Sequence, residues 1–154
     1  MSVESPGRFP SLAGALLVAA GAATSLGCQG MVGQPLTAEL RSAPLCVERH
    51  AEDRRNLAEP IAASLQAAGV GAAHAEPAGC GPETRYALRY LDNWSWDIRM
   101  YLAKLTLEVI DFGSGEILAY GEATQDSVSA LGSDPRALID RAVAALTGAR
   151  QEKP

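Results

Sequence analysis

The sequence predicts an α+β fold with a single antiparallel-rich sheet, two helices packed on one face, and the order β-α-β-β-β-β-α. Three observations predict it. An apolar stripe of helical period follows a short strand pattern early in the folded part. Strand-forming residues then dominate positions 85–124. A second helical stripe with clear start and stop signals closes the domain at 134–148.

The first strand and the first helix are expected between residues 43 and 69. Residues 43–49 (APLCVER) alternate apolar and polar side chains, which is typical of a half-buried strand. Asn56 followed by Glu59 resembles a capping box, and Gly69 is a typical helix stop. A weaker strand is expected at 70–76. The apolar stripe of the helix is Leu57, Ile61, Leu65 and Ala68.

The middle of the chain predicts three long strands. The first covers 85–91, and the second lies within 96–111, where the apolar positions change parity. Because side chains alternate strictly along a strand, this change predicts a bulge near Ala103. The segment 111–115 (DFGSG) supplies two glycines for a hairpin loop, and 117–124 returns as the partner strand.

The last helix is bounded by its own residues. Asp134 is a good N-cap, Pro135 suits the first helical position, and Gly148 is a good stop. Residues 43–149 are therefore predicted to form one globular domain, and 150–154 to form a frayed tail.

The first 27 residues predict a signal peptide of the lipoprotein type. An uncharged run from Leu12 to Gly27 is shorter than the about 20 residues that a membrane-spanning helix needs. It ends in Ser25-Leu26-Gly27-Cys28, which resembles a lipobox, the processing and lipidation site of bacterial lipoproteins. The resemblance implies that Cys28 carries the lipid, with acyl chains such as palmitate, and anchors the chain in a membrane.

An alternative stays open at this site, because Leu26 stands one place later than the lipobox pattern prefers. Ordinary cleavage nearby would then leave a soluble periplasmic protein. With lipidation, Gln29 after the cysteine favours the outer membrane over the inner one. Residues 28–42 show no clean period and are expected to form a tether.

Three cysteines fit an exported lipoprotein. Export leads to an oxidising compartment, and three thiols cannot all pair within one chain. If Cys28 carries a lipid, Cys46 and Cys80 are left to form a disulfide. Two buried thiols are the alternative.

Composition and motifs exclude several functions. The net charge is −5 and the arginines are scattered, so nucleic-acid binding is not expected. His50 and His74 match no metal-ligand spacing, and no phosphate-binding or dinucleotide motif occurs, so neither a metal nor a cofactor is expected.

The segment Asn93-Trp94-Ser95-Trp96-Asp97, followed by Tyr101, is the most distinctive part of the chain. It resembles a family of uncharacterised proteobacterial lipoproteins with an N-W-S-W-D motif before a long β-hairpin, over roughly residues 43–149. The resemblance implies a cell-envelope location and this fold. The architecture is also similar to auxiliary lipoproteins of envelope transport and assembly machines.

These observations predict a non-enzymatic envelope lipoprotein that acts as a binding or assembly accessory for an envelope protein partner. Trp94, Trp96, Asp97 and Tyr101 form the candidate binding surface, with packing in the core as the alternative for the aromatic residues. Two other functions stay open: a soluble periplasmic structural domain, and a small hydrolase with Asp97 in its site.

Overall fold

The computed structural model describes residues 30–74 and 79–149, which form a six-stranded sheet in the order β1-β6-β5-β4-β2-β3. The strands are β1 (Gly30–Gln34), β2 (Leu45–Val47), β3 (Ala72–His74), β4 (Tyr86–Trp96), β5 (Met100–Asp111) and β6 (Ile117–Thr124). The helices are α1 (Ala38–Ser42), α2 (Ala58–Ala67), α3 (Ser127–Ala130) and α4 (Pro135–Thr147). The signal peptide predicted at 1–27, Cys28 and the tail 150–154 lie outside the described residues.

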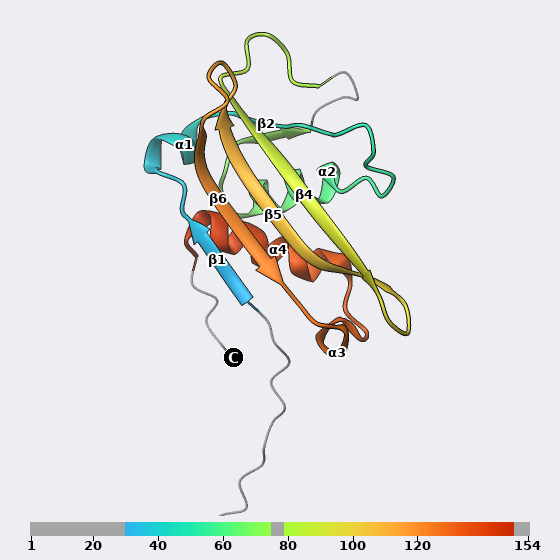
Figure 1. The fold of residues 1–154 in the computed structure, drawn as a ribbon. Coiled ribbons are helices and arrows are strands. Elements are labelled where there is room, and N and C mark those ends of the chain that lie inside the picture. The colour runs from blue at the N-terminus through green and yellow to red at the C-terminus, as the bar shows by residue number, and fades with distance from the viewer. Residues whose placement is uncertain (1–29, 75–78, 150–154) are drawn as a thin grey trace, which may run out of the picture.

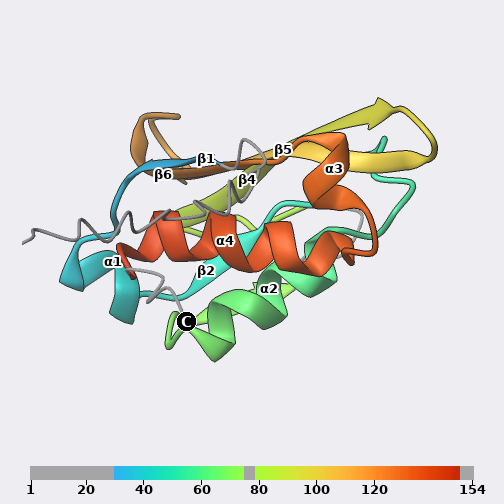
Figure 2. The same ribbon diagram turned by 90° about the horizontal axis from the view of Figure 1, so that it is seen from below.

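The predicted α+β class and helix arrangement are confirmed. The pairs β1–β6, β6–β5 and β5–β4 are antiparallel, whereas β2 runs parallel to both of its neighbours. The longer helices α2 and α4 lie on the same face of the sheet (Figures 1 and 2). The series β2, α2, β3, β4, β5, β6, α4 reproduces the predicted order.

Residues 30–42, which were expected to belong to a tether, are structured instead. Within 28–42, β1 pairs with β6 along the edge of the sheet, and α1 follows, capped by the hydroxyl of Thr37. Leu36 and Leu40 are buried, and the Leu36 N–H donates to the Leu146 carbonyl at 2.8 Å. These long-range contacts replace the missing sequence period, and the packed domain begins at Gly30 rather than at residue 43.

The start of α2 differs from the expected capping box. Asn56 does not cap the helix; it has a φ of 52° and accepts a hydrogen bond from Arg49. The carboxylate of Asp53 takes the role, accepting bonds from backbone N–H groups of Arg55, Leu57 and Ala58 at 3.1, 2.8 and 3.4 Å. A carboxylate reached from one turn upstream satisfies the same free N–H groups that an N-cap would.

The bulge expected near Ala103 is present. Asn93 pairs with Lys104 and Trp94 with Leu102, so Ala103 is the extra residue on β5. Gln125 holds the bulge in place. Its backbone N–H donates to the Ala103 carbonyl at 2.9 Å, and its side-chain amide donates to the Leu102 carbonyl at 2.8 Å.

Helix α4 packs closely on β6. Asp134 caps it and Gly148 ends it in the left-handed conformation, both as predicted. A Cβ on Gly121 of β6 would lie 2.4 Å from the Leu146 nitrogen, so only glycine allows this approach. Within residues 30–74 and 79–149, the opposite face of the sheet carries no helix (Figure 2).

Candidate functional site

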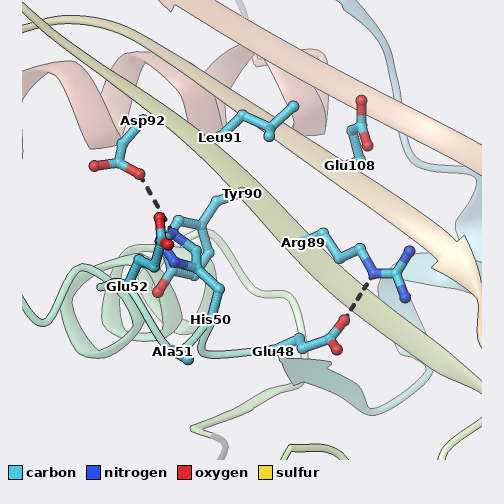
Figure 3. A pocket seen from close by; sticks show the side chains of 9 residues that line it. All are labelled: Glu48, His50, Ala51, Glu52, Arg89, Tyr90, Leu91, Asp92 and Glu108. Carbon is cyan, nitrogen blue, oxygen red and sulfur yellow. Dashed lines mark hydrogen bonds and ion pairs between the residues drawn. The ribbon is translucent and has the colours of Figure 1, made fainter. Parts of the chain in front are cut away.

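A groove of about 660 Å³ lies on the helix-free side, where the chain leaves β2 and runs beside β4 (Figure 3). Glu48 follows directly on β2, and its backbone N–H donates to the Leu88 carbonyl at 2.8 Å. This bond extends the β2–β4 pairing, and His50 then lies next to Tyr90 and Asp92 of β4. The groove is lined by Glu48, His50, Ala51, Glu52, Arg89, Tyr90, Leu91, Asp92 and Glu108.

The groove is acidic. Four of its lining side chains are carboxylates, whereas Arg89 and His50 are its basic groups. Arg89 Nε lies 2.7 Å from a Glu48 oxygen, and His50 Nε2 lies 3.4 Å from an Asp92 oxygen. Carboxylates are hydrogen-bond acceptors when ionised, so this surface suits amine or hydroxyl groups of a partner.

Tyr90 ties the groove to the helix layer. Its ring lies 4.9 Å from the His50 ring, and its hydroxyl donates to Asp53 at 2.7 Å. Burial, followed by the bond to Asp53, raises the pKa of Tyr90 far above its ordinary value, so the phenol keeps its proton. Burial also raises the pKa of Asp53, but the bonds from Tyr90 and three backbone N–H groups outweigh it and hold that pKa below its ordinary value.

Asp97, the acid of the hydrolase hypothesis, does not share a cavity with His50. Asp97 lines a small cavity of about 70 Å³ at the β4–β5 turn, whereas His50 lines the groove beside Asp92. His74 ends β3 at the far edge of the sheet. Among residues 30–74 and 79–149, no group of three His, Cys, Asp or Glu is placed to hold a metal ion.

The two tryptophans of the candidate binding surface have different environments. Trp94 is half-buried and packs against the core. Its indole N–H donates to Asp92 at 2.6 Å, and the Arg55 guanidinium stacks 3.9 Å from its ring centroid. Trp96 is 70% exposed. Trp94 is therefore a packing residue, whereas Trp96 is available as part of a surface.

Five exposed apolar side chains lie at the end of the β4–β5 hairpin and on the α3 segment, and we call them together the hairpin-tip patch: Trp96, Ile98, Met100, Val128 and Leu131. Trp96 pairs with Met100 across the β4–β5 hairpin, and Ile98, Val128 and Leu131 line the cavity shared with Asp97 and Tyr101. Arg99 donates to the Ala130 carbonyl and thereby joins the hairpin to α3.

The hairpin-tip patch extends the predicted surface. Trp96 belongs to the surface predicted from the sequence, whereas Ile98, Met100, Val128 and Leu131 were not predicted. Two apolar residues in a segment that is otherwise small and polar were the available signal.

The disulfide predicted between Cys46 and Cys80 is present and ties the loop after β3 to β2. Cys28 lies outside the described residues. In the same described part of the chain, no helix has the length and apolar character required to cross a membrane.

No protein-family model matches the chain, and no curated protein matches it. Several solved structures match the chain. The PelC dodecamer from Paraburkholderia phytofirmans has a TM-score of 0.55 and 20% identity, covering 80% of this chain and 100% of that one. A single-substitution variant of that dodecamer gives the same TM-score and coverage at 22% identity. A minor lipoprotein from Acinetobacter baumannii has a TM-score of 0.36 and 16% identity, and the match covers 74% of this chain and 91% of that one. The PelC likeness shows a shared fold.

Proposed function

We propose that this chain is an exported cell-envelope lipoprotein, anchored through Cys28, that acts as a non-enzymatic binding or assembly accessory. The observation that carries the proposal is the fold, which spans the whole length of a PelC subunit that forms a dodecamer. A chain with this fold is suited to join an assembly through its surface. We infer that the anchor holds the domain on the periplasmic side of the outer membrane.

The surfaces support a binding role over a catalytic one. The helix-free face presents an acidic groove, β1 is an edge strand among the described residues, and the hairpin-tip patch is apolar. Asp97, the acid that the hydrolase hypothesis requires, shares its cavity with Ile98, Val128 and Leu131 rather than with a histidine. Exposed apolar patches bounded by polar residues are typical of interaction sites.

The test is mass spectrometry of the protein extracted from membranes. We expect an intact mass that begins at Cys28 and carries a diacylglyceryl adduct, and we expect Cys28→Ala to lose this adduct. Native mass spectrometry of the same extract should show several copies of the chain or a co-purifying envelope protein. A soluble, unmodified monomer would contradict both parts of the proposal.

A further inference from the structure

We propose that the hairpin-tip patch contacts the lipid bilayer that holds Cys28, so that this end of the domain lies against the membrane. The proposal rests on the lipidation of Cys28 proposed above. It adds which surface faces the bilayer and which residues enter the headgroup region.

The register of the sheet places the start of the domain and the hairpin at the same end. Gly30 pairs with Thr124, Thr124 with Lys104, and Lys104 with Asn93, which makes one row across four strands. The hairpin continues beyond this row to the tip. In Figure 1 the start of β1, α3 and the β4–β5 turn all lie at the lower end of the molecule.

The covalent chain brings the anchor close to this row. Cys28 is two residues before Gly30, and two extended residues span at most about 7 Å. Neighbouring strands lie about 4.8 Å apart, so three strand spacings separate β1 from β4 by about 14 Å. A lipid on Cys28 is therefore attached within about 7 Å of Gly30, at the end of the sheet from which the hairpin tip projects.

The side chains of the tip suit a membrane surface. Trp96 and Ile98 are 70% and 80% exposed, and Val128 of α3 is 67% exposed. Tryptophan is enriched at the membrane–water interface because its ring is apolar and its N–H is polar. Arg99 and Asp97, of opposite charge, lie between the apolar side chains at the turn, as expected at headgroup depth.

The anchor at Cys28 favours the bilayer over a second copy of the chain as the partner of the hairpin-tip patch. The opposite end of the sheet also exposes an apolar side chain, Ile117, next to the β5–β6 loop. That end lies a full strand length away from Gly30, so the anchor does not bring it to the membrane. The two ends thus provide a matched comparison within one chain.

Depth-dependent fluorescence quenching tests the proposal. The chain contains two tryptophans, so Trp94→Phe reports on Trp96 alone and Trp96→Phe reports on Trp94 alone. Both full-length variants are produced in a bacterial host, purified from membranes and reconstituted in phosphatidylethanolamine–phosphatidylglycerol vesicles. The vesicles carry a lipid with a nitroxide close to the headgroup. We expect the nitroxide to quench Trp96 several-fold more strongly than Trp94.

A matched pair of substitutions in the Trp94→Phe protein tests the whole surface. We expect Ile98→Asp to reduce the quenching of Trp96 and Ile117→Asp to leave it unchanged, while both variants keep the same thermal transition. Equal and weak quenching of both tryptophans in lipidated protein would overturn the tip contact alone. An unmodified intact mass would overturn the anchor and the tip contact with it. A blue shift of Trp96 that grows with protein concentration without quenching would identify a second copy instead and overturn the bilayer assignment.

Discussion

The hydroxyl of Tyr90 donates a hydrogen bond of 2.7 Å to the Asp53 carboxylate, which itself accepts the backbone N–H groups at the start of α2. One buried carboxylate thus joins the central strand β4 to the start of helix α2, and its partner Tyr90 lines the acidic groove. Neither residue forms part of a sequence motif.

We expect Tyr90→Phe to destabilise the domain. The substitution keeps the ring but removes a hydrogen bond to a charged acceptor, which contributes about 1.5–3 kcal/mol. Chemical denaturation measures the loss. Tyr120→Phe is the control, because Tyr120 is half-buried on the helix-free face, and it should change the free energy of unfolding by about 0.5 kcal/mol or less. Equal effects of the two substitutions would contradict the role of the Tyr90–Asp53 bond.

The same carboxylate predicts a dependence of stability on pH. The pKa of Asp53 is lower in the folded chain than in the unfolded chain, because its hydrogen bonds outweigh burial. Its contribution is therefore fully present above the unfolded pKa, near 3.9, and is lost as the pH falls through the folded value. Without the bond from Tyr90, the folded pKa rises. The Tyr90→Phe protein should then show a smaller fall in unfolding free energy between neutral pH and pH 3 than the wild type, measured by urea denaturation at each pH.

The close contact between α4 and β6 leaves no room for a side chain at Gly121. A Cβ on Gly121 would lie 2.6 Å from the Ala142 carbonyl oxygen and 2.4 Å from the Leu146 nitrogen. Because both are backbone atoms, Gly121→Ala must shift the helix, and overpacking of this kind costs about 1–3 kcal/mol. Gly81→Ala is the control, since its Cβ would meet open space. Thermal unfolding of both variants should show a lowered midpoint for Gly121→Ala only.

Features that depend on neighbouring residues were predicted from the sequence, whereas the edge strand β1 was not. The parity change around Ala103 and the limits of α4 depend on neighbouring residues, and both were predicted. In contrast, β1 reads Gly-Met-Val-Gly-Gln and has no period, because its place depends on backbone pairing with β6 and on Gly33 lying beside α4. The cap of α2 was assigned to Asn56 because Asp53 reaches the helix from outside the usual spacing.

Only part of the candidate site could be predicted, because the rest also depends on the tertiary fold. Trp94 and Trp96 share parity on β4, so the sequence treats them alike. The helices cover the sheet only as far as Trp94, and this limit depends on how α2 and α4 cross the strands. The groove gathers residues of β4, β5 and the segment after β2, which only the tertiary fold brings together.

The disulfide predicts sensitivity to reduction. Cys46 and Cys80 are 34 residues apart, and closing a loop of this size stabilises a domain by about 3–4 kcal/mol in the chain-entropy account. We expect the Cys46→Ser/Cys80→Ser protein to unfold at lower denaturant concentration than the wild type. A reductant should lower the midpoint of the wild type and leave that of the double variant unchanged. A reductant effect on both proteins would point to another cause.

Truncation of the two tryptophans to alanine should reduce stability by very different amounts. Trp94 packs on the core, stacks with Arg55 and donates to Asp92, so Trp94→Ala removes buried area and leaves the Asp92 carboxylate without this donor. For a half-buried aromatic residue we expect a loss of about 2–3 kcal/mol, below the range for fully buried ones. Trp96 projects from the tip, and Trp96→Ala should change stability by about 0.5 kcal/mol or less. Urea denaturation followed by circular dichroism measures both variants without relying on tryptophan fluorescence. A comparable loss in Trp96→Ala would mean that the tip is packed in solution, and the hairpin-tip patch would then not be a free surface.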